Sequence, residues 1–95
     1  MVVGFGILKF RLYECRSLKE KRRIIKPIIE KIRRKFNASV AETGEHNSYK
    51  ISEIGFSVTG NDRRVINSII DKIILSVEYM EMTDLIDTDF EIINF

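Results

Sequence analysis

The sequence of 95 residues predicts an α+β fold, in which two helices cover one face of a four-stranded antiparallel sheet. Two periodicities support this prediction. Apolar residues alternate with other residues, as in strands that have one buried face, over 2–13, 37–45, 49–60 and 83–95. They recur at intervals of three and four, as in helices that have one buried stripe, over 17–36 and 65–77. A chain of this length has room for one core, so we expect one domain spanning residues 1–95.

The first strand has a core face and an open face. Alternation places Leu8, Phe10 and Leu12 toward the core, and it places Phe5, Ile7, Lys9, Arg11 and Tyr13 on the other side. Gly4 and Gly6 share the core side, where we expect them to admit the close packing of a helix.

The first helix is predicted to begin after Ser17 and to end at Asn37. Ser17 and Glu20 have the spacing of a capping box, which satisfies backbone N–H groups at a helix start. Pro27 lies opposite the apolar stripe, so we expect one bent helix, with two short helices as the alternative. The predicted buried stripe consists of Leu18, Ile25, Ile29, Ile32 and Phe36.

The second half of the chain is predicted to contain two strands, a second helix and a last strand. A polar turn at 45–48 separates two strands, and the Gly-Asn-Asp sequence at 60–62 ends the second of them and caps the second helix. In the last strand, Asp87, Asp89 and Glu91 are predicted to point outward. The strand residues predicted to point inward are Ala38, Val40, Ile54, Phe56, Val58, Ile86, Phe90 and Ile92.

The order strand, helix, strand, strand, helix, strand predicts a ferredoxin-like βαββαβ topology, in which the first and last strands are antiparallel neighbours. A pairing in which residue numbers sum to about 98 would place Phe5 by Ile93, Lys9 by Asp89 and Arg11 by Asp87. Charges on the open sheet face would then largely cancel. An apolar patch that includes Phe5, Ile7, Ile93 and Phe95 would remain uncovered.

The net charge of +2 conceals two oppositely charged halves. Residues 1–36 carry twelve Lys and Arg against three Glu, and residues 37–95 carry four against eleven Asp and Glu, so the halves have charges of +9 and −7. Charge asymmetry of this size concerns binding partners rather than the fold.

The stretch RSLKEKRRIIKPIIEKIRRKFNASVAE, followed by EIGFSVTGND, resembles the YlxP-like proteins of the family called domain of unknown function 503. The resemblance spans essentially the whole chain. It implies a ferredoxin-like fold, and genes that often lie near those for translation initiation and ribosome maturation. It implies no catalytic residues. This chain has Tyr49 where relatives often carry Trp before the third strand, and its His46 is shifted relative to theirs.

The basic helix is the strongest functional signal in the sequence, and two interpretations of it remain open. It predicts docking on structured RNA, possibly ribosomal, or it is only the solvated side of a helix whose cations pair with the acidic half. The residues predicted to bind RNA are Arg16, Lys19, Arg22, Arg23, Lys26 and Arg34. The alternative function is a homodimeric interaction module that uses the patch of Phe5, Ile7, Ile93 and Phe95.

Other kinds of site are not expected. RNA binding through the sheet needs aromatic rings on its open face, and the third strand offers Ile51, Glu53, Gly55 and Ser57 there. Cys15 has no recognisable base and His46 no second ligand, so we expect a non-enzymatic protein without metal or cofactor. A single cysteine, and the absence of a leader or a long apolar run, favour the cytoplasm and no membrane association.

Overall fold

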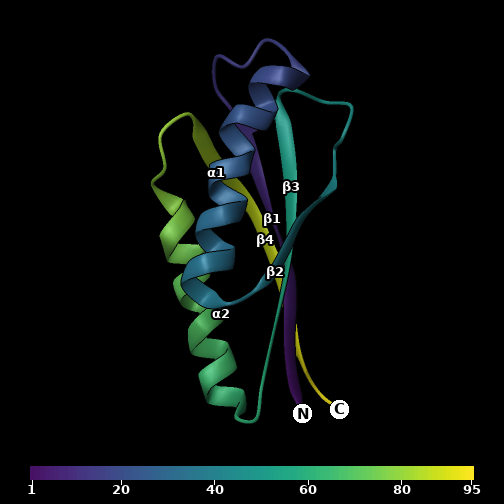
Figure 1. Cartoon of the computed structure of the whole chain (residues 1–95), viewed down its shortest axis with the longest axis vertical. Helices are drawn as coiled ribbons and strands as arrows, with labels where there is room; N and C mark the ends of the chain where they lie inside the picture. The colour runs from purple at the N-terminus through teal and green to yellow at the C-terminus, as the bar shows by residue number, and fades with distance from the viewer.

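The computed structural model describes all 95 residues and contains one four-stranded antiparallel sheet with the strand order β2-β3-β1-β4. Both helices lie on the same face of this sheet (Figure 1). The prediction of a ferredoxin-like fold is therefore confirmed. No helix combines the length and the apolar character needed to cross a membrane. The elements are β1 (Val2–Leu12), α1 (Leu18–Phe36), β2 (Ser39–Gly44), β3 (Ile51–Gly60), α2 (Arg63–Glu78) and β4 (Thr83–Asn94).

The core lies between the sheet and the two helices. The predicted inward residues of the first three strands are all buried, with Leu8, Phe10 and Ile54 fully so. Helix α1 packs mainly against β2, whereas α2 packs against β1, β4 and β3. The α2 side of the core is formed by Ile66, Ile70, Ile73 and Val77.

Helix α1 begins and ends as predicted. The Ser17 hydroxyl accepts a hydrogen bond from the backbone N–H of Glu20 at 3.1 Å, and Glu20 in turn accepts from the N–H of Arg16 at 2.7 Å. Asn37 has φ 51° and ψ 44°, the left-handed conformation common at helix ends. The helix runs through Pro27 without a break, so the alternative of two short helices is wrong.

The buried face of α1 differs from the predicted stripe. Leu18 is 36% exposed, whereas Ile28, which the prediction omitted, is only 2% exposed. The helix is turned so that Lys21, and not Leu18, faces the interior at its first turns. The prediction missed Lys21 because the buried stripe was inferred from the spacing of apolar residues alone, which leaves charged residues out. The residues that α1 buries are Lys21, Ile25, Ile28 and Ile32.

The predicted pairing of β1 with β4 is correct in direction and wrong in register. Phe5 lies opposite Glu91 instead of Ile93, Lys9 opposite Asp87 and Arg11 opposite Asp84. The register shifts again between Lys9 and Phe10, where the partner changes from Asp87 to Leu85 and Ile86 is skipped. A bulge adds one residue to one strand and so interrupts strict alternation.

The bulge explains why one predicted inward residue is exposed. Ile86 is 38% exposed, and Leu85 takes the inward position and packs against the core. Phe90 is also 38% exposed, although it lies opposite Gly6 on the core side of β1. Ile92 packs against the core as predicted.

The two glycines of β1 have different neighbours. A Cβ on Gly4 would lie 2.6 Å from Ile66 and 2.8 Å from Ile70, so Gly4 admits helix α2 as predicted. A Cβ on Gly6 would instead lie 2.4 Å from the carbonyl oxygen of Asp89, so this glycine admits strand β4 and not a helix.

We expect Gly4→Ala to lower the free energy of unfolding by about 1–3 kcal/mol, because the added methyl group overpacks the contact between β1 and α2. Urea denaturation measures the change. Ser39→Ala, on the exposed surface of β2, is the control and should stay within about 0.5 kcal/mol of the wild type. Equal stability of the two variants would contradict tight packing at Gly4.

Candidate nucleic-acid interface

The six residues predicted to bind RNA form one exposed basic face, which we call the α1 basic face. It consists of Arg16, Lys19, Arg22, Arg23, Lys26 and Arg34. All six are exposed, and none of their side chains forms an ion pair or a hydrogen bond within the chain. At 100° per residue, the five members within the helix fall in a sector of about 120°. This sector lies opposite the buried face of α1, so the structure brings these five residues together on one side, and Arg16 precedes the helix.

The remaining cations of α1 have partners within the chain. Arg33 pairs with Glu30 and donates to the carbonyl oxygen of Val40 at 3.0 Å. Lys31 donates to the carbonyl oxygen of Ser76 at 3.2 Å, across to α2. Lys35 lies 5.5 Å from the centre of the Phe36 ring. The interactions available within the fold are thus taken up by residues outside the α1 basic face.

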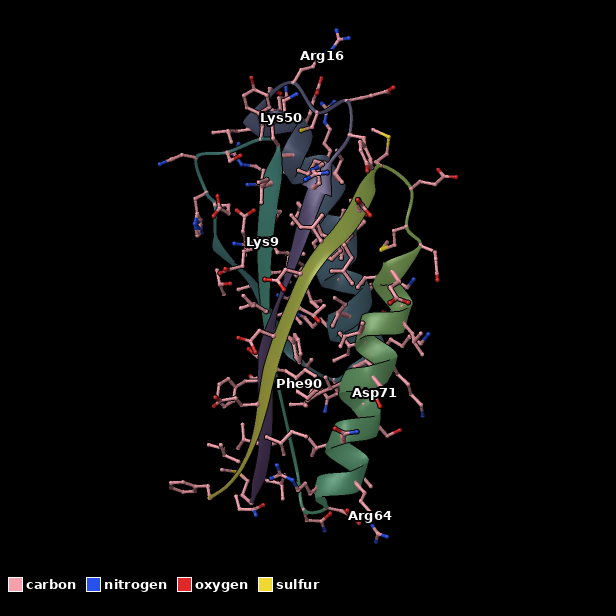
Figure 2. All side chains as sticks on the ribbon, turned by 180° about the vertical axis from the view of Figure 1, so that it is seen from behind. Lys9, Arg16, Lys50, Arg64, Asp71 and Phe90 are labelled. Carbon is pink, nitrogen blue, oxygen red and sulfur yellow. The ribbon has the colours of Figure 1, made fainter.

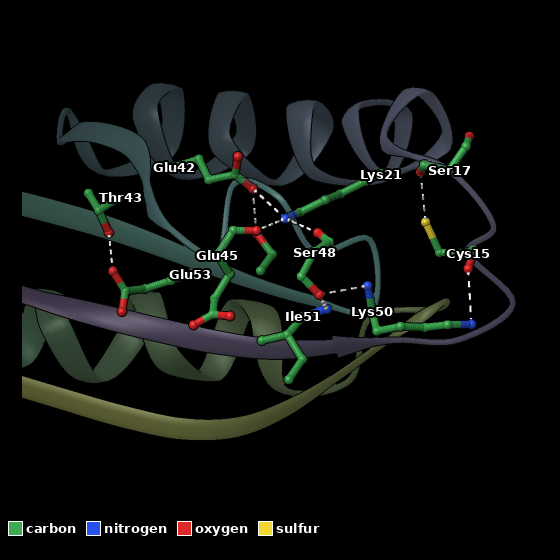
Figure 3. Close-up of polar contacts among 11 residues, drawn as sticks. Cys15, Ser17, Lys21, Glu42, Thr43, Glu45, Ser48, Lys50, Ile51 and Glu53 are labelled. Atoms are coloured by element: carbon green, nitrogen blue, oxygen red, sulfur yellow. Dashed lines mark hydrogen bonds and ion pairs between the residues drawn. The ribbon is translucent and has the colours of Figure 1, made fainter.

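Lys21 is a buried lysine that fastens the β2–β3 loop to α1. Its Nζ lies 2.7 Å from the carbonyl oxygen of Glu45, 2.5 Å from that of Ser48 and 3.2 Å from a carboxylate oxygen of Glu42 (Figure 3). Ser52 donates to the same Glu42 oxygen at 3.0 Å. Two carbonyl oxygens accept from the ammonium group and the Glu42 carboxylate pairs with its charge, which allows the side chain to be only 3% exposed.

The fastened loop forms one wall of a groove beside the α1 basic face. Arg22 and Lys26 line it from the helix, His46 lines it from the loop, and apolar side chains lie between them. The apolar lining residues are Leu18, Ile25 and Ile29. No role was predicted for His46, because the sequence shows only a polar turn at that position. In the structure, this side chain lines the same groove as two unpaired cations, Arg22 and Lys26.

The acidic half of the chain does not neutralise this surface. Helix α1 packs on the β2 side of the sheet, whereas β4 forms the opposite edge. Asp87, Asp89 and Glu91 are exposed and form no ion pair. Within α1, only Lys21 pairs with a carboxylate of the acidic half, Glu42, and no residue of the α1 basic face does so.

The four residues of the predicted interface extend from Ile7, in the middle of β1, to the end of the sheet where the chain ends lie. Phe5 is 39% exposed, Ile93 43% and Phe95 88%, and Ile7 is half-buried. The two chain ends lie side by side (Figure 1), since the amino group of Met1 donates to the carbonyl oxygen of Phe95 at 2.9 Å.

Candidate catalytic and metal-binding groups are not brought together. Cys15 is fully buried, and its Sγ donates to the carbonyl oxygen of Ser17 at 3.4 Å. No group of three or more His, Cys, Asp and Glu side chains has the arrangement of a metal site. These side chains therefore suggest no particular reaction.

Comparison with known proteins decides the family. Residues 3–90 match the family described as "Protein of unknown function (DUF503)". The chain belongs to this family. Among DUF503 relatives, the uncharacterised protein YlxP of Bacillus subtilis is 31% identical over 62 residues, which are 65% of this chain and 67% of YlxP. The resemblance inferred from the basic helix and the following strands is thus confirmed.

The DUF503 chain also has a distant likeness among solved structures. The crystal structure of a putative chlorite dismutase matches with a TM-score of 0.45 at 11% identity, over 97% of this chain. The match spans less than half of that other protein, 44% of its chain. A likeness at this level bears on neither activity nor cofactor.

Proposed function

We propose that this DUF503 protein docks on structured RNA through the α1 basic face and catalyses no reaction. The observation that carries the proposal is that six exposed cations, five on one side of α1 and Arg16 just before it, lack any partner within the chain. Such side chains can contact phosphates without first breaking an internal ion pair. Phosphate contacts by Lys and Arg supply most of the sequence-independent affinity of proteins for nucleic acids.

The spacing along the helix suits a run of phosphates. Lys19, Arg22, Arg23 and Lys26 occupy two turns of α1, which is about 10 Å of helix axis. Arg34 extends the same side two turns further, and Arg16 extends it before the helix begins. A charged surface of this length matches a groove of structured RNA better than a single small anion.

The open sheet face is less suited to binding RNA than the α1 basic face. Most of its exposed residues on β4 are carboxylates, which repel phosphates, and β3 presents no aromatic ring on that side. The family resemblance, with its implied gene neighbourhood, favours ribosomal RNA among structured RNAs.

The direct test is equilibrium binding of the wild-type protein to a labelled fragment of small-subunit ribosomal RNA, followed by fluorescence anisotropy at low salt. We expect saturable binding that weakens as salt is added, because phosphate contacts release counterions. Absence of binding at low salt would overturn the proposal.

A homodimer through Phe5, Ile7, Ile93 and Phe95 is the second candidate, because apolar patches left exposed often mark interfaces. Light scattering of the wild type against Phe5→Asp distinguishes it. A dimer that becomes a monomer on this substitution would support it, and a monomeric wild type would exclude it.

A further inference from the structure

The open sheet face carries an excess of negative charge. Helices cover only the other side, and the strands are uncovered when the molecule is seen from behind (Figure 2). Strand alternation and the observed register place two cations on this face, Lys9 and Arg11. They place five carboxylates there, on Glu53, Asp84, Asp87, Asp89 and Glu91.

A shallow hollow crosses the centre of this face. Phe5 and Ile7 of β1 form its apolar floor together with Ala41 of β2. Gly55 lies between Ile7 and Ala41 in the sheet, and the Thr43 side chain packs over it, since a Cβ on Gly55 would lie 2.5 Å from the Thr43 methyl carbon. The hollow is bordered by carboxylates on both sides, Glu53 on β3 and Asp89 and Glu91 on β4.

Most of these carboxylates have no cationic partner. Asp89 and Glu91 form no ion pair or side-chain hydrogen bond, and Glu53 accepts only from the Thr43 hydroxyl, at 2.8 Å. Lys9, which lies opposite Glu53 in the sheet, is directed instead to Glu45 of the β2–β3 loop, with 3.9 Å between Nζ and the carboxylate oxygen. The hollow therefore offers an apolar floor and an acidic border that the fold leaves unmatched.

We propose that this hollow binds an extended basic segment of a partner protein. Apolar side chains of the segment would cover Phe5 and Ile7, and its Lys or Arg side chains would meet Glu53, Asp89 and Glu91. This inference is independent of RNA docking, which uses the opposite side of the molecule. A protein that uses both surfaces brings a basic protein segment next to RNA.

Charge complementarity selects this occupant over the two others. A second copy, packed through the same face, would oppose an excess of carboxylates with an equal excess, and like charges placed together across an interface are unfavourable. Nucleic acid would meet the same repulsion. A basic segment would bury apolar surface against the floor and pair its positive charges with the carboxylates of the border.

The test uses a fluorescein-labelled peptide of about ten residues in which Lys and Val alternate, long enough to cross the hollow. Anisotropy at low salt measures its binding to the full-length protein. We expect the Lys-Val peptide to bind about tenfold more tightly than a Lys-Ser peptide, and a Glu-Val peptide not to bind. Equal binding of Lys-Val and Lys-Ser would show that the floor contributes nothing and would overturn the proposal.

Matched variants locate the binding site. Asp89→Asn with Glu91→Gln should weaken the Lys-Val peptide about tenfold, whereas Asp71→Asn with Glu78→Gln, which removes the same charge from α2, should not. Equal loss in both variants would mean that only net charge matters and would overturn the proposal. So would a wild-type dimer that Phe5→Asp dissociates, because the face would then be occupied by a second copy.

Discussion

Arg23→Glu combined with Lys26→Glu is expected to weaken RNA binding roughly 100-fold near 0.1 M salt, since two phosphate contacts are lost and two repulsive charges are added. Both side chains are exposed and have no partner within the chain, so the fold loses nothing. The midpoint of urea unfolding should accordingly stay near that of the wild type. Anisotropy with the labelled ribosomal RNA fragment measures the affinity.

The matched control is Arg64→Glu combined with Lys72→Glu on α2. It changes the net charge by the same amount and also alters exposed residues. We expect the control to reduce affinity only a few-fold, through the long-range field of the protein. If the α2 control and the α1 variant lose the same affinity, binding depends on total charge and the α1 basic face is not a docking surface.

Lys21→Met is expected to lower the free energy of unfolding by about 2–4 kcal/mol. The apolar volume of the side chain is largely kept, but the carbonyl oxygens of Glu45 and Ser48 and the Glu42 carboxylate lose their shared donor. Groups left without a partner in a part-buried site cost more than the original interaction gained. Urea denaturation, read as the shift of the midpoint at constant slope, gives the change.

Lys19→Met provides the control for Lys21, because it makes the same chemical change on an exposed side chain two residues away. It should alter stability by no more than about 0.5 kcal/mol. A Lys21→Met protein as stable as Lys19→Met would contradict the account of the loop as fastened by the Lys21 ammonium. Loss of stability only in Lys21→Met would support it.

The order of elements could be predicted because each has a local signal. The capping residues Ser17 and Asn37 mark the ends of α1, and alternation marks the strands. The register of β4 could not be predicted, because neither the two-residue offset that places Phe5 opposite Glu91 nor the bulge between Lys9 and Phe10 has a local sequence signal. The bulge takes Ile86 out of the alternation without leaving a mark in residue type, and this is why the predicted inward position of Ile86 is wrong.

The residues of the candidate RNA interface could be predicted from the sequence, but whether their charges pair within the chain could not. Periodicity alone separates the basic residues of α1 from its apolar stripe. Whether those cations pair internally depends on which edge of the sheet each helix covers. The structure places α1 on the β2 side and the acidic strand β4 at the far edge, which leaves the six side chains of the α1 basic face free.

The burial of Lys21 is the feature of the site that sequence reasoning missed. Among nine Lys and Arg residues of α1, it is chemically ordinary, and only the fold reveals its acceptors in the β2–β3 loop. One signal was available in retrospect. Lys21 occupies the helical position four residues before Ile25 and seven before Ile28, in line with the buried stripe.

The salt dependence of RNA binding by the wild-type protein tests the central claim most directly. If all six cations of the α1 basic face contact phosphates, the plot of log affinity against log salt has a slope of about −4 to −5. Affinity would then fall roughly 250- to 1000-fold between about 50 and 200 mM salt. A slope near zero, or no binding at the lower salt concentration, would contradict docking of this helix on RNA.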